Sequence, residues 1–348
     1  MNSHQNNGIV LDATRLQQSS LNQLNQPQTN DSTLMIRKAN YWMDEAKGRA
    51  IPQTLFGKFW HQGEVCILFA DSNLGKSILA VQIADAITKG QGVYPFEVES
   101  PAQPVIYCDF ELTDKQFEAR YSLNFDHHYQ FSSNFLRAEL NPDPDQQEEL
   151  EDFGDSLICD LEAAVVQNNA RVLVIDNLTY LRNETEQAKD ALSLMKQLKT
   201  LKNKYDLSIL VLAHTPKRDL TQPVTANNLQ GSKMLMNFCD SAFTIGQSNA
   251  KSEIRYLKQI KQRNTEQVFG ENNVCLCQIS KPYNFLQYEF VKFGKEWEQL
   301  QKSKVAGNDE ELINQVLDLH AEGRSLRDIG KELEISHQKA SRIIKAYA

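Results

Sequence analysis

Residues 65–77 read VCILFADSNLGKS, an apolar run that passes directly into a loop ending in Gly75, Lys76 and Ser77. The helical pattern SILAVQIADAI begins at this serine. The spacing matches G-x-x-x-x-G-K-[ST], the P-loop, in the strand-to-helix context that the motif requires. Ala70 stands where the motif usually has its first glycine, and a methyl group is tolerated there if the backbone stays in a region open to L-residues. The stretch therefore predicts a phosphate-binding turn between a buried strand and a helix.

The residues of this loop suit a polyphosphate ligand. Gly75 permits the tight turn that directs successive backbone N–H groups at the phosphates. Lys76 would neutralise the β- and γ-phosphates, Ser77 would offer its hydroxyl to Mg²⁺, and the positive end of the helix dipole adds to both effects. We therefore predict ATP and Mg²⁺ as cofactors, with the nucleotide bound by Ala70, Asp71, Ser72, Asn73, Leu74, Gly75, Lys76, Ser77 and Ile78.

Apolar runs of strand length recur along the chain, separated by helical patterns. Besides 65–69, the runs cover 105–108, 172–175 and 209–212, and the helical patterns cover 76–88, 147–167 and 184–204. Unbroken runs are typical of strands covered on both faces, and their alternation with helices favours a parallel sheet. Further runs at 242–245, 254–262, 274–279 and 285–292 predict an antiparallel extension of this sheet. The predicted fold class is α/β, with a mostly parallel sheet and an antiparallel extension.

Carboxylates follow two of these runs. Asp176 ends the run in RVLVIDNL, and Asp109 and Glu111 end the run in VIYCDFELT. Ligands of open α/β sheets bind beyond the carboxyl ends of the strands, so all three would face the nucleotide. We predict that Asp176 holds Mg²⁺ together with Ser77, although it would also suit a helix cap. Glu111 is the candidate for activating the attacking water, and Asp109 either replaces it or supports it.

Composition and charge limit the function classes. The chain has 348 residues and a net charge of −8, so any surface for nucleic acid must be a local basic patch. No apolar stretch approaches the roughly 18 residues that span a bilayer, and the N-terminus lacks the pattern of a secretory signal. Six cysteines in a chain of this length are no disulfide framework. We expect a cytoplasmic protein without membrane segments or a structural metal.

The chain divides into segments of different composition. Residues 1–30 contain twelve Asn or Gln without periodicity, which predicts a disordered polar tail over 1–33. The globular pattern continues to residue 299, and LQKSKVAGN over 300–308 is a plausible linker. We therefore predict an ATPase domain over 34–299 and a small helical domain over 309–348.

Taken in order, these motifs resemble the RecA-like ATPases, above all the branch that holds hexameric replicative helicases and the RepA-like helicases of mobile elements. The resemblance covers roughly residues 50–295. It implies that Glu111 activates water and that His214, in ILVLAHTPKRD, senses the γ-phosphate. It also matches LQGSKMLMNFCDSAF to a family segment, through Gly231, Ser232 and Asp240.

The same resemblance implies an active site shared between two copies of the chain. LKQIKQRN is similar to the family strand whose lysine and arginine reach the nucleotide of the neighbouring subunit; here these are Lys261 and Arg263. A site completed by a neighbour needs a heterologous interface, and a heterologous interface that closes gives a ring. The implied assembly is a hexamer. Without the resemblance, K-Q-R would be a solvated charge run.

The C-terminal forty residues have a three-helix pattern. Apolar residues recur at helical spacing, Gly323 ends the first helix, Ser325 with Asp328 begins the second, and Ser336 begins the third. The pattern looks like the helix-turn-helix ends of resolvases and sigma-type factors. It predicts contacts to duplex DNA from His337, Gln338, Lys339, Ser341, Arg342 and Lys345. A protein-interaction module is the alternative, because eight acidic residues in 309–348 outnumber six basic ones.

The sequence favours an ATP-driven DNA motor of the hexameric helicase type, which acts in the replication or mobilisation of DNA. In this function single-stranded DNA would pass through the ring, with Lys217 and Arg218 as candidate phosphate contacts. A second hypothesis is a DNA-anchored regulatory ATPase whose nucleotide state controls assembly without unwinding. A strand-exchange recombinase is less favoured, because the pattern of Lys261 and Arg263 is closer to that of helicases.

Overall fold

A computed structural model describes residues 34–141, 153–177, 189–229, 232–301 and 304–347. The chain divides into two compact units, residues 1–52 and Gln53–Ala348. In the first unit helix α2 (Ala39–Lys47) has no buried residue. The predicted start of the ATPase domain at residue 34 stays a prediction. The predicted disordered tail, 1–33, lies outside the described residues.

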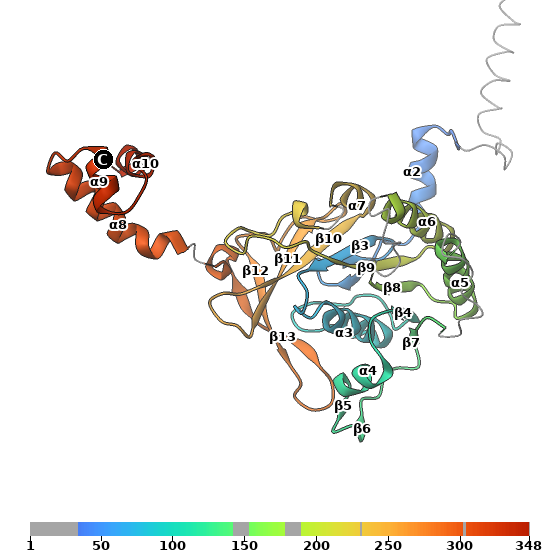
Figure 1. Cartoon of the computed structure of the whole chain (residues 1–348). Helices are drawn as coiled ribbons and strands as arrows, with labels where there is room; N and C mark the ends of the chain where they lie inside the picture. Colours follow the sequence, from blue (N-terminus) through green and yellow to red (C-terminus); the bar gives the residue numbers. More distant parts are fainter. Residues whose placement is uncertain (1–33, 142–152, 178–188, 230–231, 302–303, 348) are drawn as a thin grey trace, which may run out of the picture. The chain divides into compact units, whose positions relative to one another are not determined.

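Among the described residues, nine strands form one sheet in the order β13-β12-β11-β10-β3-β9-β8-β4-β7 (Figure 1). The six strands from β10 to β7 are parallel, and β11, β12 and β13 are antiparallel. Their bounds are β3 (Val65–Ala70), β4 (Val105–Asp109), β7 (Phe135–Ala138), β8 (Val172–Asp176), β9 (Ser208–His214), β10 (Ser241–Gln247), β11 (Ile254–Lys261), β12 (Val274–Ser280) and β13 (Gln287–Gly294). The predicted α/β class is confirmed.

One strand of the predicted antiparallel extension belongs to the parallel sheet. β10 pairs in parallel with β3, with Phe243 opposite Leu68, so the antiparallel part begins only at β11. The reason is the connection from β9 to β10, which includes helix α7 (Ser232–Phe238). A crossover of this length returns the chain to the starting end of the sheet, which a tight turn does not allow.

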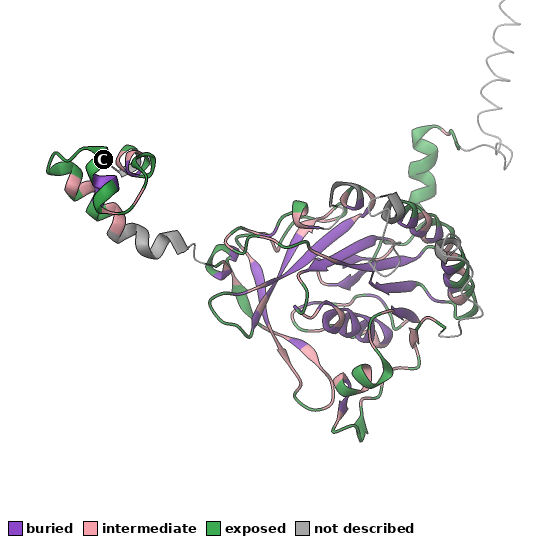
Figure 2. Ribbon diagram, in the orientation of Figure 1, coloured by how far each residue is buried: buried purple, intermediate pink, exposed green. Residues whose placement is uncertain are grey.

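Strands β3, β4, β8 and β9 are buried on both faces, as their unbroken apolar runs predicted (Figure 2), whereas β7 is partly buried and β13 is partly exposed. In β3, Val65, Ile67 and Phe69 pack in one core cluster with residues of α5 (Phe153–Gln167) and α6 (Lys189–Tyr205). Cys66 and Leu68 alternate with them and pack against α3 (Lys76–Lys89). Each such side chain contributes ~1.5–3 kcal/mol by leaving water, so β3 and the loop that follows it are held firmly.

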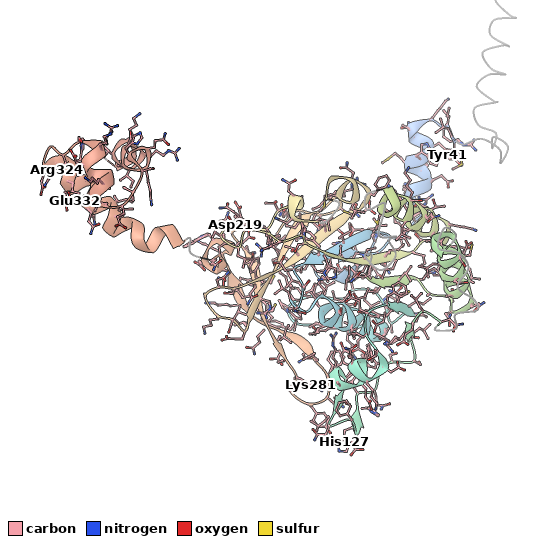
Figure 3. All side chains as sticks on the ribbon, in the orientation of Figure 1. Tyr41, His127, Asp219, Lys281, Arg324 and Glu332 are labelled. Carbon is pink, nitrogen blue, oxygen red and sulfur yellow. The ribbon has the colours of Figure 1, made fainter. Side chains whose placement is uncertain are left out.

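Smaller elements cover the ends of the sheet. They are the hairpin β1 (Thr54–Phe56) and β2 (Trp60–His61), helix α4 (Asp114–Arg120), the hairpin β5 (Ser122–Leu123) and β6 (His127–His128), and the 3₁₀ turns η3 (Ala226–Asn228) and η4 (Glu296–Gln299). The turn between β12 and β13 contacts the end of α4. There Lys281, labelled with His127 in Figure 3, donates to the carbonyl of Ala119 at 2.6 Å and to that of Ser122 at 2.5 Å.

The cysteines are free thiols, and five of the six are buried. Cys275 and Cys277 pack in the same core cluster, as their spacing on one strand predicted. Burial raises the pKa of the Cys277 thiol to about 12.

No helix in the described ranges combines the length and the hydropathy needed to cross a bilayer.

Three C-terminal helices, α8 (Lys304–Ala321), α9 (Leu326–Glu332) and α10 (His337–Tyr347), pack around Val316, Ile329, Ala340 and Ile343. Gly323 has φ 81°, and the Ser325 hydroxyl accepts a hydrogen bond from Asp328 N, as the sequence predicted. α8 begins inside the predicted linker 300–308, which is therefore shorter than expected. A single glycine such as Gly307 costs only about 1 kcal/mol in a helix interior and does not end it.

Candidate functional site

The predicted nucleotide-binding residues, together with Glu111, Asp176 and His214, lie at one edge of the sheet, where the parallel strands end. β3, β9, β8 and β4 are neighbours in this order, and their carboxyl ends carry the P-loop, His214, Asp176 and Asp109. A cavity of about 380 Å³ lies here, lined by Ser72, Asn73, Gly75, Lys76, Ser77, Ile78, Glu111, Arg120 and His214. Residues 70–78 are thus one turn around a cavity that also contains acidic and basic side chains.

Gly75 is required by both backbone and packing. Its φ is 88°, in the left-handed region, and it stands directly before the first residue of α3. A Cβ atom at this position would lie 2.8 Å from Ile279 Cδ1 and 3.0 Å from Tyr288 Oη. Tyr288 Oη also donates a hydrogen bond to the carbonyl of Leu74. Strands β12 and β13 therefore pack on the P-loop and hold its shape.

Lys76 is a nearly buried cation, 6% exposed. Its Nζ donates to the carbonyl oxygens of Ala70 at 3.1 Å and Asp71 at 3.3 Å. Burial lowers the pKa of Lys76, against the opposing effect of Asp176, Glu111 and Asp71. A buried ammonium group without a full counter-charge favours an anionic ligand, because an anion compensates the loss of water.

Asp176 is fully buried and has one unsatisfied oxygen. Its Oδ2 accepts a hydrogen bond from Tyr107 Oη at 2.6 Å, whereas Oδ1 has no partner among the described residues. Burial raises the pKa of Asp176 to about 6, although the hydroxyls of Ser77 and Tyr107 favour its ionised form. A buried carboxylate oxygen without a donor, close to a serine hydroxyl, fits an oxygen-preferring cation such as Mg²⁺.

The two acidic residues after β4 differ in what they contact. Asp109 is 2% exposed; its Oδ2 accepts from Arg137 Nε at 3.0 Å, and its Oδ1 accepts from Leu112 N at 3.0 Å. Glu111 is exposed, lines the cavity and accepts a hydrogen bond from Asn177 Nδ2. Of the two alternatives, Glu111 is the one that water can reach, and Asp109 shapes the turn that carries it.

His214, the last residue of β9, lies between the P-loop and Glu111. Its Nδ1 is 3.1 Å from Lys76 Nζ, and its Nε2 is 3.5 Å from Glu111 Oε1. A charged lysine can only donate, so Nδ1 accepts from Lys76. Nε2 also lies 3.0 Å from Asn177 Nδ2, so Asn177 and Glu111 meet at the same ring atom. The hydrogen bond from His214 is the largest cause that lowers the pKa of Glu111.

Arg120 lines the cavity and was missed by sequence reasoning. It ends α4, which begins with a capping box between Thr113 and Gln116. Its Nη1 is buried without a hydrogen-bond partner among the described residues, and its carbonyl accepts from Leu286 N at 3.1 Å. The sequence shows a basic residue nine positions after Glu111, a signal too weak to single it out. The tertiary structure adds this second cation to the cavity.

Lys261 and Arg263 lie at the opposite edge of the sheet. Lys261 Nζ donates to the carbonyls of Met236 and Cys239, and Arg263 Nη1 pairs with Asp240 Oδ1 at 3.2 Å. Asp240 N in turn donates to the carbonyl of Val65, the first residue of β3. β3 rises by ~17 Å from there to the P-loop, so neither cation reaches the cavity of its own chain. Of the matched family segment, Gly231 lies outside the described residues.

The predicted DNA contacts fall into two groups. In α10, His337, Gln338, Lys339, Arg342 and Lys345 are exposed, and Ser341 is partly buried. In the segment after β9, Lys217 is exposed, but the side chain of Arg218 is only 5% exposed and its Nε pairs with Asp71 Oδ2 at 3.0 Å. The prediction that Arg218 faces DNA is corrected: the sheet order brings it to a P-loop carboxylate, which binds it instead.

Comparison with known proteins identifies a family. The family model described as an AAA domain matches residues 32–219, more than half of the chain. The solved structure of a KaiC-like protein from the archaeon Pyrococcus horikoshii OT3 aligns with a TM-score of 0.45 at 16% identity, over 66% of this chain and 91% of that one. A comparison with curated proteins gave no match.

Proposed function

Since the chain belongs to the AAA domain family and is a P-loop ATPase, we propose that it is an ATP-driven DNA motor of the RecA-like hexameric helicase type. The observation that carries the proposal is the division of the predicted catalytic residues between two edges of one sheet. Lys76, Asp176, Glu111 and His214 lie around the cavity, whereas Lys261 and Arg263 lie beyond its reach. A second copy of the chain would bring the two halves together. Because the proposed motor acts on DNA, we propose that the protein works in the cytoplasm.

The cavity supports the binding of a nucleoside triphosphate. Backbone N–H groups of the P-loop and the start of α3 would face the phosphates, and Lys76 would exchange its carbonyl partners for phosphate oxygens. Ser77 and Asp176 would hold Mg²⁺, which supplies positive charge against the phosphates when bound. Among the described residues, no group of three or more His, Cys, Asp or Glu is arranged to hold a metal ion. Ser77 and Asp176 would share the ion with the nucleotide.

The general base for hydrolysis would be Glu111. His214 lowers the pKa of this carboxyl, which favours the ionised form that can accept a proton from water. His214 contacts Lys76 through its other ring nitrogen, and this contact supports the role of His214 as the γ-phosphate sensor. A change at the phosphates would therefore reach Glu111 through a single side chain.

The neighbouring subunit would complete the site. Arg263, with 47% of its side chain exposed, would leave Asp240 to reach the phosphates of the adjacent copy, and Lys261 would accompany it. Arginine fingers of this kind contribute on the order of 10³-fold or more to turnover. Because such an interface is heterologous, its closure gives the proposed hexameric ring.

DNA binding would use two basic surfaces. Exposed residues of α10 would enter the major groove of a duplex, and Lys217 would contact the strand in the channel. α10 has Lys339, Arg342 and Lys345 and no acidic residue, which suits a polyanion on an otherwise acidic chain.

ATPase rate measured with and without single-stranded DNA, together with unwinding of a forked duplex, tests the motor. The expected result is strong stimulation and strand separation, both absent in Lys76→Ala. ATP hydrolysis that persists in Lys76→Ala would contradict the shared site on which every version of the proposal depends.

The alternative is a DNA-anchored regulatory ATPase, and one observation favours it. Arg218, one of the two candidate channel cations, is bound by Asp71 and leaves only Lys217 in that role. The alternative predicts sequence-specific duplex binding through α10 and a turnover that single-stranded DNA does not change. A fork that stays intact under those conditions would decide for it.

A further inference from the structure

Asp71 is an acidic residue inside a loop that binds anions. As the second residue of the P-loop, it has a carboxylate that is 27% exposed. This carboxylate raises the pKa of Lys76, which shows that its field extends to the phosphate-binding ammonium. An unpaired negative charge at this position would repel an incoming polyphosphate.

Two side chains from the end of β9 compensate this charge. Thr215 Oγ1 donates to Asp71 Oδ1, and Arg218 Nε donates to Asp71 Oδ2 at 3.0 Å. Thr215 N also donates to the carbonyl of Ala70 at 3.2 Å, so the first turn of the P-loop is bonded to the chain beyond β9 by backbone and side chains. A charge-assisted pair of this kind is about twice as strong as a neutral hydrogen bond.

Arg218 is itself held in place by its own segment. Its Nη1 donates to the carbonyl of Gln222 at 3.4 Å, and the turn between them is closed by Asp219, labelled in Figure 3, which accepts from Thr221 N at 2.9 Å. The carbonyl of Leu220 accepts from Gln301 N at 3.1 Å. With 5% of its side chain exposed, the arginine is preorganised toward Asp71 and away from solvent.

We propose that Arg218 is a positioning residue of the phosphate site, which neutralises Asp71 and holds the first turn of the P-loop open to polyphosphate. The inference rests on the proposed nucleotide binding. Arg218 touches no substrate in this role; it acts through Asp71. The P-loop of this chain tolerates an acidic residue because the segment after β9 supplies the matching cation.

The test is the affinity for a fluorescent ADP analogue with Mg²⁺, measured on the full chain. Arg218→Ala leaves the carboxylate without its counter-charge, with only the Thr215 hydroxyl still donating to it, and we expect the Kd to rise on the order of tenfold. The double variant Asp71→Asn with Arg218→Ala removes the repelling charge as well, and its Kd should return to within about threefold of the wild type. Arg218→Lys, which keeps the charge, should lie between the wild type and Arg218→Ala.

Arg171→Ala is the matched control, because it removes an exposed arginine directly before β8 whose side chain donates to the carbonyl of Tyr205, far from the P-loop in the sequence. Its Kd should equal that of the wild type. If Arg218→Ala is insoluble, Asp71→Asn is compared with the double variant; the two should have equal Kd, since Arg218 is dispensable once residue 71 is neutral.

The inference would be overturned by equal Kd values for Arg218→Ala and Arg171→Ala, or by a Kd of the double variant that stays as high as that of Arg218→Ala. If Arg218→Ala is insoluble, a higher Kd in the double variant than in Asp71→Asn would overturn it. Failure of the proposed function looks different, since the wild type itself would then bind no nucleotide.

Discussion

His214 Nδ1 lies 3.1 Å from Lys76 Nζ, and the Nε2 of the same ring lies 3.5 Å from Glu111 Oε1. The imidazole of His214 thus contacts both Lys76, which is predicted to bind the phosphates, and the carboxylate of Glu111, which is predicted to activate water. These residues follow or end three different strands, β9, β3 and β4; β9 is the neighbour of β3, and only β8 separates it from β4.

Replacing His214 should slow hydrolysis more than it weakens binding. His214→Ala removes the side chain that lies between Lys76 and Glu111, and we expect kcat to fall on the order of a hundredfold with nucleotide affinity within about threefold. His214→Gln, whose amide donates and accepts, should retain more activity. Steady-state kinetics measures both, with His127→Ala as the exposed control. An unchanged kcat in His214→Ala would remove His214 from the site.

Arg120→Ala should weaken nucleotide binding. The guanidinium lines the cavity with an unpartnered Nη1, and its loss should raise the Kd of a fluorescent ADP analogue on the order of tenfold. Lys115→Ala removes an exposed cation from the same helix and should leave the Kd unchanged. Equal affinities of the two variants would show that Arg120 faces no phosphate.

The raised pKa of Asp176 predicts a pH-dependent stability without Mg²⁺ and nucleotide. Because the folded chain holds this proton up to about pH 6 and the unfolded chain releases it near pH 4, folding takes up a proton between these values. Stability from this group is therefore full below about pH 4 and is lost as the pH rises to about 6. The loss is on the order of 3 kcal/mol.

Urea unfolding at pH 5 and pH 8 measures this dependence. Asp176→Asn stays neutral, so it should be more stable than the wild type at pH 8 and should lose less stability between pH 5 and pH 8. Asp126→Asn, at an exposed carboxylate, is the control and should follow the wild type. If Asp176→Asn is less stable than the wild type at pH 8, burial does not set the pKa of Asp176.

Mixing two inactive variants tests the shared site. Lys76→Ala supplies an intact Arg263, and Arg263→Ala supplies an intact P-loop. If the arginine acts on the neighbour's nucleotide, mixed assemblies contain interfaces with both groups, and ATPase activity should reappear on mixing. Mass measured in solution should show assembly of both variants. Assembled mixtures that stay inactive at every ratio would rule out the trans role.

The C-terminal helices should bind duplex DNA in a salt-dependent way. Arg342→Ala removes one exposed charge of α10, so binding should weaken and the slope of log K against log salt should become shallower by about one. Arg324→Ala, which removes an exposed arginine between α8 and α9, should bind as the wild type does. Binding that is equal in all three proteins would favour the protein-interaction module.

The sequence predicted the parts of this structure that depend on neighbours along the chain. The P-loop is a local motif, because Gly75 must turn the backbone and Lys76 must open the helix within one short stretch. The strand runs were likewise read correctly, since burial on both faces leaves only apolar residues between the first and the last residue of β3, β8 and β9. The parallel pairing of β10 was missed, because the length of a crossover says little about which strand it reaches.

The tertiary structure alone decided which side chains meet. Arg120 reaches the cavity only because α4 folds back along the sheet, and Arg218 meets Asp71, 147 residues away, only because β9 pairs with β3. Lys261 and Arg263 are separated from the P-loop of the same chain by the length of β3. The composition of a segment determines whether it forms a strand or a helix. Which side chains come into contact depends on the order of the strands, and this order is set by packing over the whole sheet.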